Sequence, residues 1–431
     1  MLLGLFVALL VMIFLGIPVI LSLGLVGLAG ILIVPELALP LYPQKMFSSL
    51  DSFSLLAMPY FILAGELMSR GGISRKLVDF AETVVGHMRG GLAQANIVSS
   101  MIFAGVSGSS TADTSAVGSV LIPAMKEKGY PAGYAAAITA TSSTIGAIIP
   151  PSMTMIVYGA LASVSVGGLF MAGIIPGILI GFALMSVVYL HSLSPSRHPE
   201  LQKSGQKFSI KRCLRSLVDV WAALVAPLII VGGILGGVFT ATESGVVACV
   251  FAFLVSFFLY RTIKLRDLPQ IFVQAAVTTS MVLGIIGIAS GFGWLLSYLN
   301  FNQMILSAIM STTQDPTAVF LLLVGVMLVL TMFVDSMAVL IITVPIAVHI
   351  GHAVGINDLQ LGLALVMATQ IGSTTPPVAV LLFVASSIAK CPYGETMRYS
   401  WSFIAAEIVA LLLVVFFEPL TTAIPSYVFG H

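Results

Sequence analysis

The chain has 431 residues, of which 58% are hydrophobic and 8% are charged, and its formal net charge is +1. Soluble domains carry roughly 25% charged residues, so this composition excludes a water-soluble globular protein and indicates an all-α polytopic membrane protein. The near-neutral charge gives no indication of a nucleic-acid partner. Cys213, Cys249 and Cys391 share no short spacing, so neither a disulfide framework nor a cysteine metal site is expected.

Residues 1–69 are predicted to form the first spans of a scaffold. Residues 1–34 are apolar and are interrupted by Gly16-Ile17-Pro18. One span needs about 20 residues, so we expect two short or tilted helices that meet at this break. No basic residue precedes the apolar stretch, which argues against a cleaved signal peptide. A further span is expected at 53–69.

A surface arm and a re-entrant hairpin are predicted next. In residues 72–89, charged and apolar residues alternate at helical spacing, as in a helix that lies at the membrane interface. The following stretch, 90–128, has basic residues at both ends and a polar cluster in its middle. It is too short for two full crossings, so we expect two half-depth legs. Its basic ends place the open side of this hairpin in the cytoplasm.

A broken crossing helix is predicted at 132–162, because Pro150 and Pro151 remove backbone donors and disfavour helix before them. A return helix at 166–193 follows. The loop 194–219 then separates the two halves of the chain and carries the strongest cytoplasmic signal. Its basic residues are Arg197, Lys203, Lys207, Lys211, Arg212 and Arg215.

The second half, 220–431, is predicted to repeat the plan of the first half, residues 1–200. Its segments are scaffold spans at 221–299, a surface arm at 300–313, a hairpin at 316–350, a broken helix at 361–389 and a last helix at 393–420. No Lys or Arg occurs from Asn300 through Gln370, so this hairpin is expected to open to the outside. We therefore expect two inverted-topology repeats with about ten transmembrane helices and two re-entrant helical hairpins.

Two ordered elements recur between the halves and support an internal duplication. Asp113 lies ten residues before Pro123, and Asp335 lies ten residues before Pro345. Downstream of each pair, the run from Ile145-Gly146 to Pro150-Pro151 matches the run from Ile371-Gly372 to Pro376-Pro377. Inverted repeats of this kind place substrate and coupling ions near the membrane midplane, where unwound carbonyls coordinate Na⁺.

The polar residues at the hairpin tips and helix breaks predict two Na⁺ sites with an organic anion between them, and no other cofactor. The first Na⁺ site is expected to comprise Ser107, Gly108, Ser109, Ser110, Thr111, Asp113, Gly146 and Pro150. The second is expected to comprise Asp335, Ser336, Gly372, Thr374, Thr375 and Pro376. The anion is expected to contact Ser110, Thr111, Ser152 and Ser373.

Structural roles for these residues remain open alternatives. Ser, Thr and Gly in membrane helices often serve close packing, and Asp113 and Asp335 suit helix capping as well as ion binding. Glu243 is either a cap or a packing contact. Glu66 and Arg70, four residues apart, are expected to pair at the interface. Structural roles are expected for His191, His349 and His352.

Enzymatic and channel functions are weighed against transport. The two aspartates lack the Gly-x-Gly-Asp context of aspartic proteases, and no P-loop, His-Glu-x-x-His motif or Gly-x-Ser-x-Gly elbow occurs in a suitable context. The chain is therefore not expected to be an enzyme. A passive channel is possible, but duplicated hairpins with unwound helices suit alternating access better.

Four segments resemble the large membrane (M-type) subunit of TRAP (tripartite ATP-independent periplasmic) transporters. They are residues 51–66, 107–117, 148–152 and 239–243. The similarity runs nearly end to end, although Ala241 stands where the family usually has proline.

The resemblance implies an elevator-type secondary transporter that takes up an organic acid anion by symport with Na⁺. It further implies a small four-helix membrane subunit (Q-type), a periplasmic substrate-binding protein (P-type), and a bacterial or archaeal inner membrane. Both termini are expected in the periplasm. A stand-alone Na⁺/carboxylate symporter or a channel that needs no binding protein is the alternative.

Overall fold

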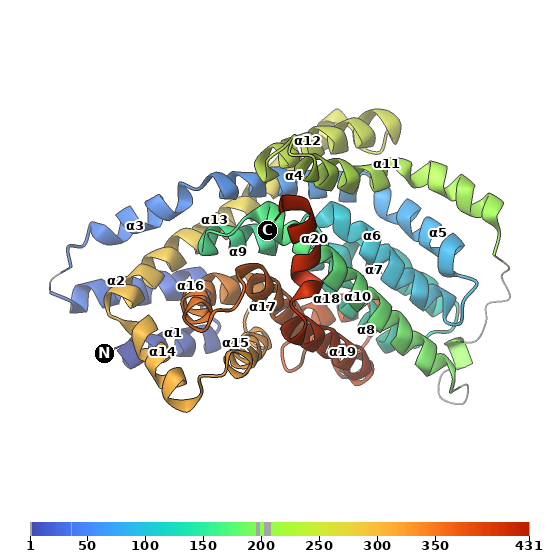
Figure 1. Cartoon of the computed structure of the whole chain (residues 1–431). Helices are drawn as coiled ribbons and strands as arrows, with labels where there is room; N and C mark the ends of the chain where they lie inside the picture. Colours follow the sequence, from blue (N-terminus) through green and yellow to red (C-terminus); the bar gives the residue numbers. More distant parts are fainter. Residues whose placement is uncertain (1, 36, 195–198, 202–207, 431) are drawn as a thin grey trace.

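The computed structural model describes residues 2–35, 37–194, 199–201 and 208–430. These residues form α-helices with short 3-10 and π segments, and they contain no β-strand. The all-α class expected from the composition is confirmed. In Figure 1 the helices α6 and α7 (cyan) lie to the right of α17 and α18, and α15 and α16 (orange) lie to their left.

The first half contains ten α-helices within the described residues. They are α1 (Leu2–Phe14), α2 (Val19–Ile33), α3 (Leu41–Leu50), α4 (Ala57–Arg70), α5 (Ile73–Val85), α6 (Gly91–Ser107), α7 (Ser110–Glu127), α8 (Ala132–Ser142), α9 (Met153–Ala162) and α10 (Val166–Ser192). The 3-10 segments are η1 (Phe53–Leu56), η2 (Ser143–Ala147) and η3 (Pro199–Leu201).

The second half contains another ten α-helices within the described residues. They are α11 (Ile210–Leu235), α12 (Ala241–Leu254), α13 (Leu268–Tyr298), α14 (Phe301–Thr312), α15 (Pro316–Thr331), α16 (Ser336–Val354), α17 (Asp358–Gly372), α18 (Val380–Ala389), α19 (Tyr393–Phe416) and α20 (Pro419–Phe429). A π segment, η4 (Val255–Leu259), extends α12, and η5 (Leu265–Asp267) precedes α13.

Six helices in the described part of the chain are long and apolar enough to cross a membrane. They are Val166–Ser192, Ile210–Leu235, Ala241–Leu259, Leu265–Tyr298, Ser336–Val354 and Tyr393–Phe416. A seventh candidate combines α3 with η1 and α4 across a bend of 61°. The other apolar helices, including α6, α9, α15 and α18, have 10 to 17 residues, too few for a full crossing of about 20.

Polar residues at the helix starts explain where many of these helices begin. A side-chain oxygen that accepts a hydrogen bond from the first turn satisfies a backbone donor that has no helical partner. This N-cap role falls to Ser109 (α7), Ser152 (α9), Ser165 (α10), Thr240 (α12), Asp315 (α15), Asp335 (α16) and Asn357 (α17). At α12, Thr240 and Glu243 form a reciprocal capping box, which establishes the capping alternative for Glu243.

Two boundaries differ from the sequence-based expectation. Residues 194–219 were expected to be a loop, but α11 begins at Ile210, so Lys211, Arg212 and Arg215 lie on helical turns that precede its apolar stretch. Arg197, Lys203 and Lys207 lie outside the described residues. The last helix was expected over 393–420, but α19 ends at Phe416 and a separate helix, α20, follows from Pro419, because proline cannot continue the ladder of helical hydrogen bonds.

The two hairpins pack in a reciprocal pattern. The α6–α7 hairpin packs on α8 and η2 of its own half, and α7 also packs on α18 of the other half. The α15–α16 hairpin packs on α17 of its own half, and α16 also packs on α9 of the other half. Each hairpin therefore contacts the first part of its own broken helix and the second part of the opposite one. The duplicated elements of the sequence thus have corresponding neighbours.

The close approach of α15 and α17 depends on a glycine. A Cβ atom added at Gly372 would overlap Thr331 Oγ1 and would lie 2.6 Å from the backbone oxygen of Leu328. A backbone oxygen cannot swing away as a side chain can. Gly372 is therefore explained by helix packing, the role that small residues commonly have in membrane interfaces.

The packing role predicts that Gly372→Ala lowers the melting temperature of the detergent-solubilised protein. Forced overpacking of this kind costs about 1–3 kcal/mol. The matched control is Gly325→Ala on α15, where a new Cβ would meet nothing within 4 Å. This control should leave the melting temperature unchanged or raise it, because alanine favours helix by about 0.5–1 kcal/mol over glycine. Equal melting temperatures for Gly372→Ala and the wild type would contradict the packing role.

Candidate functional site

The tip of the first hairpin is a short turn between α6 and α7. Ser107 ends α6, and Gly108 follows with φ +62°, a left-handed conformation that suits glycine. Ser109 then caps α7 by accepting a hydrogen bond from Ala112 N at 3.4 Å. The polar cluster of the sequence is therefore a helix end followed directly by a helix start, with Ser110 and Thr111 in the first turn of α7.

The tip of the first hairpin is bonded to the start of α9, directly after the first helix break, residues 143–152. Met153 N donates to Gly108 O at 3.2 Å. The approach is close, since a Cβ at Gly108 would lie 2.6 Å from Pro151 O. The Pro150-Pro151 peptide bond is cis. Ser152 caps α9, and its hydroxyl donates to Ala147 O at 2.5 Å.

Asp113 is fully buried in the first turn of α7 beside this break. Neither of its carboxylate oxygens has a hydrogen-bond partner among the described residues. Ser100 and Ser143 lie next to the carboxylate without bonding it in regular geometry, and a Cβ at Gly146 would lie 3.3 Å from Asp113 Cβ. A buried charge without a partner is costly, so this position fits a cation. Capping does not explain Asp113, because Ser109 is the cap.

The second hairpin tip is built differently. Asp335 is exposed and caps α16, its Oδ1 accepting hydrogen bonds from Met337 N at 3.0 Å and Ala338 N at 3.3 Å. The capping alternative therefore applies to Asp335. The tip is bonded to the second helix break, residues 373–379, by Val378 N, which donates to Met332 O at 3.2 Å. This bond corresponds to the one from Met153 to Gly108 in the first half.

The hydroxyls of the second break are directed back along α17. Ser373 donates to Gln370 O at 2.6 Å, and Thr374 and Thr375 donate to Ile371 O at 2.8 and 2.7 Å. The Pro376-Pro377 peptide bond is cis, as is its counterpart in the first break. These hydroxyls satisfy carbonyls that lose their helical partners where α17 ends.

Both tips and both breaks meet at one cavity of about 90 Å³. Its lining residues are Gly108, Ser109, Ser110, Thr111, Ala147, Met153, Thr154, Asp335, Ser336, Met337, Gln370, Ser373, Val380 and Leu381. A hydrogen bond of 2.7 Å from Ser110 Oγ to Gln370 Oε1 crosses between the halves at this cavity. Elements more than 200 residues apart in sequence thus share one polar site.

The structure divides the predicted site residues into two groups. Of the residues expected to contact the anion, Ser110, Thr111 and Ser373 line the cavity, whereas Ser152 does not. The predicted ion ligands that do not line it are Ser107, Asp113, Gly146, Pro150, Gly372, Thr374, Thr375 and Pro376. Asp113 and Gly146 lie together behind the first tip, so an ion there would be separate from a ligand in the cavity.

The sequence reasoning missed Gln370, Thr154 and Glu407. Gln370 directly precedes the repeated Ile371-Gly372 element, and a glutamine within an apolar helix is itself a signal. Glu407 is a fully buried carboxyl in the middle of the apolar helix α19. An acid at such a position should have been treated as a functional candidate.

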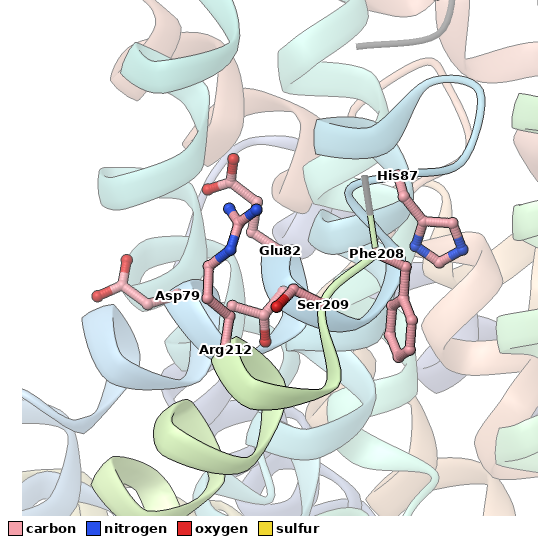
Figure 2. A pocket seen from close by; sticks show the side chains of 7 residues that line it. Asp79, Glu82, His87, Phe208, Ser209 and Arg212 are labelled. Carbon is pink, nitrogen blue, oxygen red and sulfur yellow. The ribbon is translucent and has the colours of Figure 1, made fainter. Parts of the chain in front are cut away.

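A second cavity, of about 230 Å³, lies between α5 and the start of α11, away from the hairpin tips. Figure 2 shows Arg212 between Asp79 and Glu82, with His87 and Phe208 on the far side. No group of three or more His, Cys, Asp or Glu residues in the described part of the chain is arranged to hold a metal ion. No residue of the hairpin tips or of the helix breaks lines this cavity, so it is not the candidate site.

Residues 6–420 match the family model described as "Tripartite ATP-independent periplasmic transporter, DctM component". The chain is 36% identical over 407 residues to the C4-dicarboxylate TRAP transporter large permease protein DctM of Pseudomonas aeruginosa, covering 94% of each chain. It is 32% identical over 420 residues to the sialic acid TRAP transporter large permease protein SiaM of Vibrio cholerae, covering 97% of each.

A longer relative and a solved structure are also similar. The isethionate TRAP transporter permease protein DctMQ of Oleidesulfovibrio alaskensis is 35% identical, and the match covers 96% of this chain and 64% of that one. The Alcanivorax borkumensis YdaH transporter has a similar fold, with a TM-score of 0.56 at 14% identity over 88% of this chain and 90% of that one.

The geometry at Asp335 predicts that Asp335→Ala lowers the melting temperature. Loss of a capping side chain costs about 0.5–2 kcal/mol. Asp335→Ser keeps a capping oxygen and should recover most of the loss, although it removes the negative charge. Thermal unfolding of the three proteins in detergent measures this. If Asp335→Ala melts like the wild type, Asp335 does not stabilise α16.

Proposed function

This chain belongs to the DctM component family of tripartite ATP-independent periplasmic transporters, and we propose that it is a large permease subunit that takes up an organic acid anion by symport with Na⁺. The relatives described above are named as transporters of C4-dicarboxylates, of sialic acid and of isethionate, which supports an organic acid as the substrate class. Transport rather than catalysis is the activity. The observation that carries the proposal is the single cavity where both hairpin tips and both helix breaks meet.

Na⁺ is proposed as the coupling ion because of Asp113. Its buried carboxylate oxygens are free to coordinate, and the broken backbone beside it supplies carbonyl oxygens, the ligands that unwound helices offer to Na⁺ in transporters. A second Na⁺ is proposed at the second break, around Thr374 and Thr375. The anion then lies in the cavity, against Ser110, Thr111 and Ser373, where neutral hydroxyls can donate hydrogen bonds to a carboxylate.

An elevator motion is proposed as the way in which the cavity alternates between the two sides of the membrane. The hairpins and the broken helices pack on one another and form the moving body. The scaffold consists of α2, α3 and α4, which pack on α13, and of α12, which packs on α4. Gly65 of α4 supports a sliding contact, since a Cβ there would lie 3.3 Å from Ser107 O of the first hairpin. Small residues allow two helices to approach closely.

The proposed partners are a small four-helix membrane subunit (Q-type) and a periplasmic substrate-binding protein (P-type). The proposed location is a bacterial or archaeal inner membrane, with both termini in the periplasm. Basic residues support this orientation, because Lys211, Arg212 and Arg215 at the start of α11 and Arg261, Lys264 and Arg266 after α12 mark one side. The positive-inside rule assigns that side to the cytoplasm.

The Na⁺ site predicts that NaCl raises the melting temperature of the detergent-solubilised protein relative to choline chloride at the same concentration. A ligand at 100 times its Kd stabilises the folded state by about 2.7 kcal/mol. Asp113→Asn should lose this Na⁺-specific shift. The control is Asp79→Asn, which changes an exposed aspartate on α5 and should keep the shift. If Asp113→Asn keeps the full Na⁺-specific rise in melting temperature, Asp113 is not a ligand of the Na⁺ site.

The transport function predicts accumulation of an organic acid in proteoliposomes that contain this chain with its small subunit. Uptake from a panel including succinate, sialic acid and isethionate should need both an inward Na⁺ gradient and the cognate binding protein. Uptake without the binding protein would favour a stand-alone symporter. Flux that never exceeds equilibrium would favour a channel.

A further inference from the structure

Two glutamines of α17 are buried, but their side-chain amides are bonded in different ways. Gln360, near the start of the helix, is 7% exposed, and Gln370, in its last turn, is 2% exposed. The Nε2 atom of Gln360 donates to Val414 O at 2.9 Å and to Val415 O at 3.1 Å. These carbonyls belong to the last turn of α19, where no helical donor reaches them. The Gln360 amide therefore has a structural role.

The amide nitrogen of Gln370 has no such partner. The Oε1 atom of Gln370 accepts a hydrogen bond from Ser110 Oγ at 2.7 Å, so Nε2 is turned away from Ser110. Nε2 forms no hydrogen bond within the described residues, and it is not enclosed. Since Gln370 lines the cavity between the hairpin tips, the cavity is where this nitrogen is open. An unpaired donor inside a protein is costly, so its position indicates a ligand that accepts a hydrogen bond.

Gln370 also accepts the protons of two cavity hydroxyls. Ser110 donates to its side chain, and Ser373 Oγ donates to its backbone oxygen at 2.6 Å. A hydroxyl group has one proton to donate. Thr111 keeps its proton, since its Oγ1 donates no hydrogen bond within the described chain. Of the three hydroxyls proposed to face the anion, only that of Thr111 is a free donor, and the Gln370 amide adds two N–H groups beside it.

The charges around the cavity favour the first hairpin tip as the place of an acidic group. No Lys, Arg or His lines the cavity in the described part of the chain, whereas the carboxylate of Asp335 lies at the second tip. Like charges repel, so an anionic group is disfavoured beside Asp335. The first tip is the start of α7, an 18-residue helix whose N-terminus carries a partial positive charge. Gln370 is bonded to this tip through Ser110.

We propose that Gln370 is a substrate-binding residue, whose side-chain amide donates a hydrogen bond to the carboxylate or sulfonate group of the transported acid. Ser110 is the positioning residue that orients the amide, because it fixes Oε1 and leaves Nε2 facing the cavity. The amide and the Thr111 hydroxyl together can donate to two oxygens of one acidic group. The inference rests on the proposed function, since it names the residue that recognises the acid.

Binding measurements on the detergent-solubilised full-length chain test this assignment. Succinate, sialic acid and isethionate are titrated separately in NaCl, and the rise in melting temperature with concentration gives the Kd of each acid. Gln370→Met keeps the length of the side chain but removes the donor. It should weaken the binding of any acid that the wild type binds by about 10-fold to 100-fold, because hydrogen bonds to charged groups are among the strongest.

The matched control is Gln360→Met, the same substitution on the same helix. It should lower the melting temperature, because two carbonyls of α19 lose their donor, and it should leave the Kd unchanged. Wild-type affinity in Gln370→Met would overturn the proposal. Equal weakening in both variants would also overturn it, since the cause would then be a loosened α17. Should Gln370→Met fail to fold, Gln370→Asn, which draws the amide back by one methylene, replaces it and should weaken binding likewise.

Thiol labelling tests separately whether position 370 faces the cavity. Gln370→Cys and the wild type are treated with methanethiosulfonate ethylsulfonate, a small anionic reagent, and the adducts are counted by intact mass above those of the three native cysteines. Gln370→Cys should gain one adduct more than the wild type, and an acid that the wild type binds should slow this reaction. An equal number of adducts in both proteins would contradict an amide open to the cavity.

The outcomes distinguish this inference from the proposed function. If the wild type binds none of the three acids, the proposed substrate class fails, and the inference fails with it. If the wild type binds an acid and Gln370→Met binds it equally well, the inference alone fails and the proposed function stands.

Discussion

Broken helices in a membrane must find partners for the backbone groups that the break releases, and the core of this protein is arranged around that requirement. Each break lies against the tip of its own hairpin, and one backbone bond joins the two, from Met153 to Gly108 and from Val378 to Met332. Side-chain hydroxyls of Ser152 and Ser373 satisfy further carbonyls. The first tip approaches its break closely because Gly108 lies at the contact, where a Cβ would lie 2.6 Å from Pro151 O. The polar cavity is a consequence of these paired ends.

Local signals account for most of the fold that could be predicted from the sequence. Proline pairs, glycines and capping residues act within a few residues, so they indicate in the sequence where a helix begins, ends or breaks. The repeated Asp-to-Pro spacing misled in one respect. Asp113 lies in the first turn of α7, whereas Asp335 precedes α16, so the same spacing gives one buried carboxylate and one exposed cap. Where a helix begins depends on the cap available nearby, which the spacing does not determine.

The contacts that could not be predicted are those between distant segments. Ser110 and Gln370 are 260 residues apart, and Thr144 and Glu407 are 263 apart. No local pattern indicates which hydroxyl will face which partner, because the packing of the two halves decides it. The cavity therefore contains Thr154 and Gln370, which were not predicted there, and lacks Ser152, which was predicted to contact the anion. The sequence alone could have identified Glu407 as a buried acid, but it could not have identified Thr144 and Thr374 as the partners of its carboxyl group.

The reciprocal packing of the hairpins has a consequence for biosynthesis. The first half emerges from the ribosome with one face of α7 and one face of α9 uncovered, because their partners α18 and α16 are made later. Lipid chains can shield apolar side chains in the meantime, but they offer no hydrogen-bond acceptor to the hydroxyl of Ser110, whose partner Gln370 belongs to the second half. The uncovered faces of α7 and α9 therefore gain their partners only after the second half has been made.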